Sequence, residues 1–61
     1  MSNTTIRDEL KQYIKKHGIR QNYISKKCGV STTTINLFLH GKRDLALGRL
    51  EILYFLMQGK L

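Results

Sequence analysis

The sequence predicts an all-α domain of four helices, at about residues 5–17, 21–28, 32–40 and 45–58, in which the middle two form a helix-turn-helix. Two observations support this fold class. Apolar residues recur at helical spacing in the first three segments, and a glycine follows each of the four, at Gly18, Gly29, Gly41 and Gly59. The 61 residues make one domain, residues 1–61. A domain this small buries only about 60% of its unfolded surface, so we expect modest stability.

The helix-turn-helix prediction rests on residues 21–40. Gly29 can adopt a positive φ after one helix, and Ser31 can accept a hydrogen bond from the free amides of the next. Small Ser25, one turn before Gly29, lets the two backbones approach. The apolar residues that should face each other across the motif are Ile24, Cys28, Val30, Ile35 and Phe38. The residues left on the free face, which such motifs press into the major groove of DNA, are Thr32, Thr33, Asn36 and Leu37.

The first helix should run from about Thr5 to His17. Thr5 can cap its first amides, and Asp8 and Glu9 oppose the positive end of the helix dipole. Gly18 suits a left-handed stop. The residues expected on its buried face are Ile6, Leu10, Tyr13 and Ile14.

The three threonines at the start of the third helix have poor helix propensity. This favours a role for their side chains over local stability. The alternative is that residues 32–34 merely fill a helix start.

The last helix should begin after Asp44, which is a plausible cap, and it contains six consecutive apolar residues at 52–57. Such a run covers every side of a helix, and a domain of this size cannot bury all of them, so the surplus predicts a partner surface. Two copies meeting about a two-fold axis satisfy it most simply. A membrane-surface anchor and an overfull monomer core are the alternatives. The dimer interface is assigned to Ile52, Tyr54, Phe55 and Met57.

The charge distribution favours a polyanionic partner. Eleven Lys and Arg against four Asp and Glu give a formal charge of +7, and from Leu10 to Arg43 there are eight basic residues and no acidic one. A folded chain with this central section should carry a positive face suited to a polyanion. The alternative is a solvated surface that keeps the protein soluble.

Several function classes are disfavoured. No run is long enough to span a bilayer, and no signal or lipidation segment is evident, so we expect a cytoplasmic protein without membrane contact. The single Cys28 cannot form an internal disulfide and reads as a small buried apolar residue. Neither histidine has a nucleophile or metal-ligand spacing around it. We therefore expect no enzyme activity, no metal, no cofactor and no small-molecule substrate.

Residues from about Leu10 to Met57 resemble the Cro and repressor type of helix-turn-helix proteins, the XRE family, which is common in bacteriophages and their hosts. The family pattern opens the second helix with Gln, continues with an aliphatic residue followed by a small one, then Gly-Val-Ser, an aliphatic residue four places after the Ser, and a Gly past the third helix. The matching residues are Gln21, Ile24, Ser25, Gly29, Val30, Ser31, Ile35 and Gly41. The resemblance implies a compact lambda-repressor-like fold.

The resemblance also implies roles for single residues. Gln21 is similar to the family residue that binds a backbone phosphate and braces the reading helix, and His40, Lys42 and Arg43 occupy positions that touch phosphates. Thr32, Thr33, Asn36 and Leu37 stand where the family contacts base edges and methyl groups. The implied protein is a Cro-like repressor that binds an inverted-repeat operator as a homodimer, in a bacterial or phage-infected cell.

Three positions depart from the family pattern. Arg20 replaces the usual Thr cap of the second helix, while Leu37 and Leu39 replace residues that are commonly polar or charged. Either the two leucines pack against thymine methyl groups and the protein core, or they form a contact surface for another protein. The alternative function is therefore a small helix-turn-helix protein that acts through protein contacts, as an antirepressor or an inhibitor of a host protein. RNA binding lacks support because exposed aromatics are not interleaved with the cations.

Overall fold

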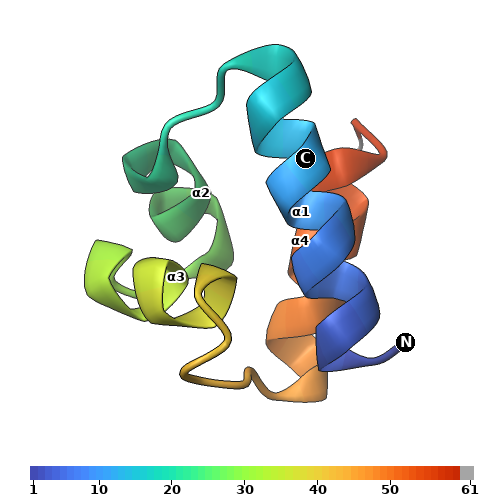
Figure 1. Cartoon of the computed structure of the whole chain (residues 1–61), viewed down its shortest axis with the longest axis vertical. Helices are drawn as coiled ribbons and strands as arrows, with labels where there is room; N and C mark the ends of the chain where they lie inside the picture. Colours follow the sequence, from blue (N-terminus) through green and yellow to red (C-terminus); the bar gives the residue numbers. More distant parts are fainter. Residues whose placement is uncertain (60–61) are drawn as a thin grey trace.

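The computed structural model describes residues 1–59, and within them it contains four helices and no strand. They are α1 (Asn3–His17), α2 (Gln21–Cys28), α3 (Thr32–Leu39) and α4 (Leu47–Met57). Helices α1 and α4 pack against each other, α2 and α3 pack against each other, and α2–α4 and α1–α3 contacts join the two pairs (Figure 1). The predicted all-α, four-helix arrangement is confirmed.

One core lies between the four helices. Every helix turns a face of regularly spaced apolar residues inward, as an amphipathic helix must to remove that face from water. The core residues are Ile6, Leu10, Ile24, Cys28, Ile35, Phe38, Leu39, Leu45, Leu50, Leu53 and Leu56. Leu39, whose position departs from the family pattern, is thus a core residue, while Tyr13, Ile14 and Val30 are partly buried against the cluster.

Helix α1 begins two residues earlier than predicted. Ser2 caps it, because its hydroxyl accepts a 3.1 Å hydrogen bond from the amide of Thr5. The cap expected at Thr5 is wrong: the Thr5 hydroxyl accepts a hydrogen bond from Ser2 Oγ instead. With the helix starting at Asn3, the first turn holds no acidic residue, so Asp8 and Glu9 lie too far along the helix to oppose its dipole strongly.

Helix α4 begins at Leu47, two residues later than predicted, and the cap expected at Asp44 is wrong. Ala46 precedes the helix and offers no side-chain hydrogen bond. The carboxylate of Asp44 is bound to Arg7 at 2.8 Å, and Leu45 is buried in the core. Residues 44–46 therefore stay non-helical because their contacts are made with α1 and the core.

The predicted stops of the first two helices are confirmed. Gly18 has φ 65° and its amide donates to the carbonyl of Ile14 at 2.8 Å. Arg20 precedes α2 without a side-chain cap, as the departure from the family pattern implied. Helix α3 ends at Leu39, with His40 just beyond it. Among residues 1–59, no helix is both long enough and apolar enough to cross a membrane.

Candidate nucleic-acid interface

The turn between α2 and α3 sets the angle at which α3 leaves the core. Gly29 has φ 75°, and the amides of Gly29 and Val30 both donate to the carbonyl of Ser25, at 2.9 and 3.2 Å. A side chain at Gly29 would be strained by this φ, and its Cβ would lie 2.9 Å from Arg49 Nη1. Ser25 is only 5% exposed, which agrees with the small residue expected at the point of close approach.

Helix α3 begins with a side-chain cap at Ser31. The hydroxyl of Ser31 accepts a 3.1 Å hydrogen bond from the amide of Thr34 and lies 2.9 Å from the Thr34 hydroxyl. The cap predicted at Ser31 is confirmed. An N-cap stabilises a helix by about 1 kcal/mol, which helps α3 to begin at three threonines although threonine has poor helix propensity.

Helix α3 divides into a buried and an exposed face. Ile35, Phe38 and Leu39 are buried against α1 and α2. Thr32, Thr33 and Asn36 are exposed, and Leu37 is half-buried. Because residues three and four apart share a face of a helix, these four form one outward strip, which we call the α3 outer face.

Two side chains predicted to touch phosphates lie beside the α3 outer face. Gln21, half-buried at the start of α2, has its Oε1 3.5 Å from the Nδ2 of Asn36. His40 has its Nδ1 2.8 Å from the carbonyl of Asn36, at the other end of α3. The fold thus brings Gln21 next to Asn36, which lies 15 positions further along the chain, whereas His40 contacts Asn36 from the next turn of the same segment.

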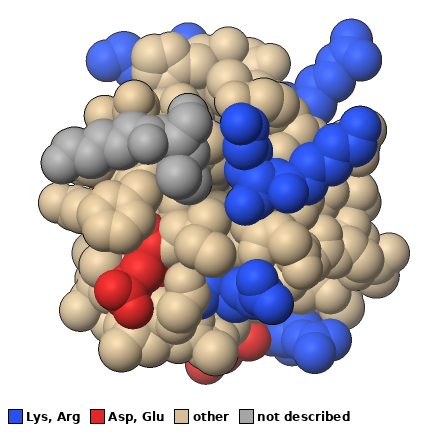
Figure 2. All heavy atoms as spheres, turned by 180° about the vertical axis from the view of Figure 1, so that it is seen from behind, with Lys and Arg blue, Asp and Glu red and all other residues tan. Residues whose placement is uncertain are grey.

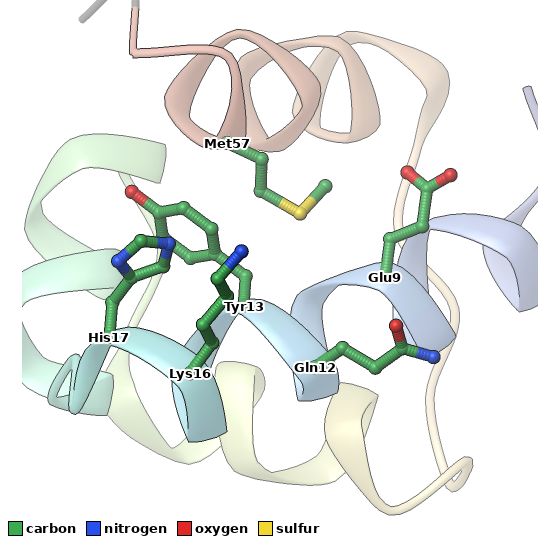
Figure 3. A pocket seen from close by; sticks show the side chains of 6 residues that line it. All are labelled: Glu9, Gln12, Tyr13, Lys16, His17 and Met57. Carbon is green, nitrogen blue, oxygen red and sulfur yellow. The ribbon is translucent and has the colours of Figure 1, made fainter.

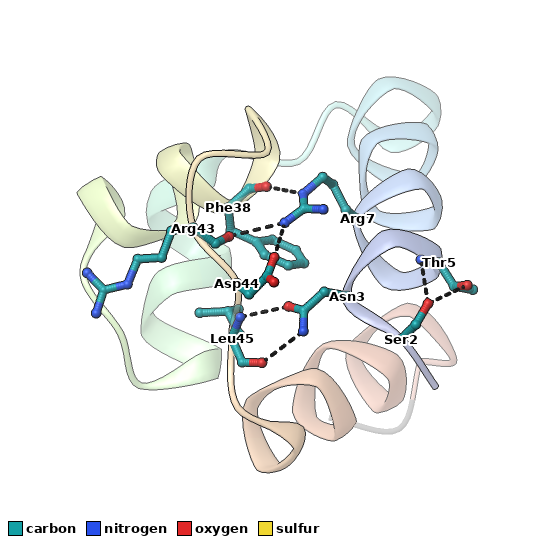
Figure 4. A network of polar contacts seen from close by, with 8 residues as sticks. All are labelled: Ser2, Asn3, Thr5, Arg7, Phe38, Arg43, Asp44 and Leu45. Atoms are coloured by element: carbon teal, nitrogen blue, oxygen red, sulfur yellow. Dashed lines mark hydrogen bonds and ion pairs between the residues drawn. The ribbon is translucent and has the colours of Figure 1, made fainter.

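Lys42 and Arg43 are both exposed in the segment that follows α3. Two α1 residues that sequence reasoning did not single out hold this segment; we call Asn3 and Arg7 the loop anchor (Figure 4). Asn3 pairs with the backbone of Leu45: its Oδ1 accepts from Leu45 N at 2.7 Å and its Nδ2 donates to Leu45 O at 3.2 Å.

Arg7 makes the second half of the loop anchor. Its guanidinium donates to the carbonyl of Phe38 and to that of Arg43, binds the Asp44 carboxylate at 2.8 Å, and lies 4.7 Å from the centre of the Phe38 ring. A cation at the carboxyl end of α3 adds a second donor to the Phe38 carbonyl, which also accepts from the amide of Gly41 at 3.1 Å, and it suits the helix dipole. In the sequence, the only feature that could have indicated this role is that Arg7 lies next to Ile6 on the apolar face of α1.

The charged residues are distributed unevenly along the part of the chain that contains α2 and α3. Helices α2 and α3 with their flanking segments, residues 20–43, carry Arg20, Lys26, Lys27, Lys42 and Arg43 and no acidic residue. Helix α3 itself is uncharged. Asp44 is the nearest acid in the sequence, and Arg7 pairs with it. Figure 2 shows Lys and Arg side chains at several points of the face seen from behind, with the acidic side chains in the lower half of the view.

The thiol of Cys28 is not accessible at this surface. The residue is buried, and that burial raises the pKa of its thiol, an effect that the nearby Arg49 charge partly opposes. Within residues 1–59 no three His, Cys, Asp or Glu side chains are grouped as a metal site would require.

Helix α4 leaves several large apolar side chains exposed to solvent. Of the four residues assigned to a dimer interface, Tyr54 and Phe55 are exposed, with ring centroids 5.9 Å apart, while Ile52 and Met57 are half-buried against the core. Leu47 is 60% exposed, and sequence reasoning did not assign it to the interface.

Met57 also borders a shallow depression between α1 and the end of α4 (Figure 3). The rings of Tyr13 and His17 lie 4.7 Å apart at one end of it, and Glu9 stands at the other. Gln12 and Lys16 complete its lining. The mixture of one acid, one lysine and an open shape gives no concentrated charge or enclosed volume for a ligand.

Comparison with known protein families identifies the family to which this helix-turn-helix belongs. A family model described as Helix-turn-helix matches residues 10–53, which include the whole of α2, α3 and the segment that follows. Comparison with curated proteins and with solved structures gave no match. The matched family is one of DNA-binding regulators, whose members are not typically enzymes. The chain therefore belongs to the Cro and repressor type, or XRE, family of helix-turn-helix DNA-binding proteins.

Proposed function

We propose that this protein is a sequence-specific transcriptional regulator of the Cro-like repressor type, which inserts α3 into the major groove of double-stranded DNA. The observation that carries this proposal is the α3 outer face, which offers hydrogen-bonding side chains to solvent while the opposite side of the helix is locked into the core. An α-helix with its side chains is about 10–12 Å in diameter, which fits a major groove about 12 Å wide.

The base-contacting residues in this proposal are Thr32, Thr33, Asn36 and Leu37. Asn36 can form a paired hydrogen bond with adenine, and threonine and leucine methyl groups can pack on the thymine methyl. Helix α3 has no Lys or Arg, so it lacks the side chains that most often read guanine. The operator should therefore favour A·T pairs at the positions under this face.

The phosphate-contacting residues in this proposal are Gln21, His40, Lys42 and Arg43. All four flank the α3 outer face, and the loop anchor supports the segment that carries Lys42 and Arg43. Cations that neutralise phosphates release condensed counterions, so the affinity they provide is independent of sequence and falls steeply with salt.

We further propose that two copies bind an inverted-repeat operator. The largest Cα extent of one chain is 23 Å, whereas successive major-groove half-sites lie about 34 Å apart, so one chain cannot fill two half-sites. The exposed apolar side chains of α4 supply a surface for the second copy. The interface residues are Ile52, Tyr54, Phe55 and Met57. In a bacterial or phage-infected cell, a regulator of this kind works in the cytoplasm, where the DNA lies.

In-vitro selection from random double-stranded DNA, followed by mass measurement of the complex, tests the proposal. We expect an approximate inverted repeat bound by two chains, and an affinity that falls steeply between about 50 and 200 mM salt. The rival is a module that binds an acidic partner protein through Leu37 and the apolar residues of α4. That rival predicts no enriched sequence and little DNA affinity at physiological salt, which would overturn the proposal.

A further inference from the structure

The three threonine hydroxyls of α3 are not equivalent. Thr34 is engaged with the Ser31 cap, at 2.9 Å. Thr32 has its Oγ1 3.2 Å from the hydroxyl of Ser25 on α2. Thr33 makes no side-chain hydrogen bond to any residue between 1 and 59, so its hydroxyl can turn to donate or accept.

The proton of Ser25 is already committed. Its Oγ lies 2.9 Å from the carbonyl oxygen of Asn22, which can only accept. If the Ser25 proton pointed elsewhere, two oxygen lone pairs would face each other at that distance inside a protein, where the repulsion is poorly screened. Ser25 is nearly fully buried, so water cannot take the place of either partner. Ser25 therefore donates to Asn22 and has only lone pairs left for Thr32.

It follows that Thr32 is the donor in its contact with Ser25. A hydroxyl has one proton, and Thr32 uses it towards the interior. The same contact holds the Thr32 side chain in one rotamer, with its oxygen towards α2. What remains available to an outside partner is the lone-pair side of the oxygen and the methyl group.

We infer that Ser25 is a positioning residue for base recognition, which fixes Thr32 as a hydrogen-bond acceptor. This rests on the proposed function. Thr32 should favour a base that presents an exocyclic amine in the major groove, adenine or cytosine, and disfavour guanine O6 and thymine O4, which are acceptors. A free threonine such as Thr33 cannot make that distinction, because it can bond either kind of group.

The test is a base-by-base competition assay on the selected operator. Thr32→Val keeps the shape of the side chain and loses the hydroxyl, so the operator position whose preference changes identifies the base read by Thr32. At that position the wild type should prefer the amine-bearing base over the acceptor bases by about tenfold, the value of one hydrogen bond of about 1.4 kcal/mol. Ser25→Ala frees the Thr32 proton, and the preference should fall to about twofold or less.

Two controls separate this role from a structural one. Ser25→Ala made in a Thr32→Val background should change no base preference, whereas a general disturbance of α3 would change it in both backgrounds. Replacing the preferred adenine or cytosine by an analogue without the amine should cost the wild type the same tenfold, whether or not Ser25→Ala folds. If Thr32→Val alters no position, or Ser25→Ala leaves the preference intact, the inference is wrong although sequence-specific binding stands. If the wild type selects no sequence at all, the proposed function itself fails.

Discussion

Arg49 and Cys28 exchange hydrogen bonds where α4 crosses the end of α2. The Arg49 guanidinium donates to the carbonyl of Cys28 at 2.9 Å, and the Cys28 thiol donates to the carbonyl of Arg49 at 3.8 Å. The pair joins α4 to the turn that orients α3. It also explains why Gly29 has no room for a side chain, since the guanidinium occupies that space.

Gly29→Ala should lower the free energy of unfolding by about 2 kcal/mol. About 1–2 kcal/mol comes from a positive φ in a residue with a Cβ, and the rest from displacing the Arg49 guanidinium from Cys28. Gly18→Ala is the matched control, because Gly18 has a similar φ and open space around it. Urea unfolding should show the larger loss at Gly29. Equal losses at the two glycines would mean that the Arg49 contact adds nothing.

Arg7→Lys should lower the free energy of unfolding by about 1–2 kcal/mol, because a lysine cannot serve both the Phe38 and Arg43 carbonyls. Asp44→Asn should cost less than about 0.5 kcal/mol, because the Asp44 side chain is 73% exposed and surface ion pairs contribute little. Thermal or urea unfolding measures both. A larger loss for Asp44→Asn would show that the ion pair, and not the carbonyl contacts, holds the segment.

Alkaline pH should weaken the fold through Cys28. Burial raises the pKa of its thiol above the ordinary value of 9.0, so the folded state disfavours the thiolate that forms in the unfolded chain. The resulting stabilisation is complete below about pH 9 and is lost as the pH rises towards the folded-state pKa. Cys28→Ala lacks this dependence. The stability gap between wild type and Cys28→Ala, measured by urea unfolding, should therefore narrow as the pH rises above about 9, and a constant gap would contradict the burial effect.

Phe55→Glu should shift the protein towards the monomer if α4 forms the dimer interface. A carboxylate at the centre of an apolar contact costs several kcal/mol when it is desolvated. Gln58→Glu places the same charge at an exposed position just beyond α4 and should leave the oligomeric state unchanged. Sedimentation or light scattering reports the mass. Phe55→Glu should also remove the advantage of a full operator over a half-site, and an unchanged advantage would place the interface elsewhere.

Local chemistry made much of the fold predictable. A serine cap, a glycine stop and apolar spacing act within a few residues, so the turn at Gly29 and the exposed and buried faces of α3 could be read from the sequence. The predicted helix caps were wrong where two neighbouring residues could each serve as the cap, or where a residue distant in the sequence bound the expected cap. Ser2 and Thr5 are both residues that can cap a helix, and in the structure Ser2, the one closer to the N-terminus, is the cap.

The contacts that were missed join residues far apart in the sequence. The sequence around Asp44 predicts a helix cap, but its carboxylate is bound by Arg7, which lies 37 positions away in the sequence. The pairing of Ser25 with Thr32, seven positions apart, depends on the crossing of two helices that the hydrophobic pattern predicts only in outline. The roles proposed for the α3 outer face could be predicted from the sequence pattern, whereas the direction of each hydroxyl required the coordinates.

In the function proposed above, the α3 outer face reads the base sequence, while the neighbouring cations supply affinity for DNA of any sequence. Asn36→Ala and Lys42→Ala, measured against the selected operator and against scrambled DNA, test it most directly. Asn36→Ala should reduce discrimination by about 1–3 kcal/mol while scrambled-DNA affinity stays unchanged. Lys42→Ala should weaken both DNAs alike and lower the salt slope by about 1. Equal loss of discrimination in the two variants would contradict the claim.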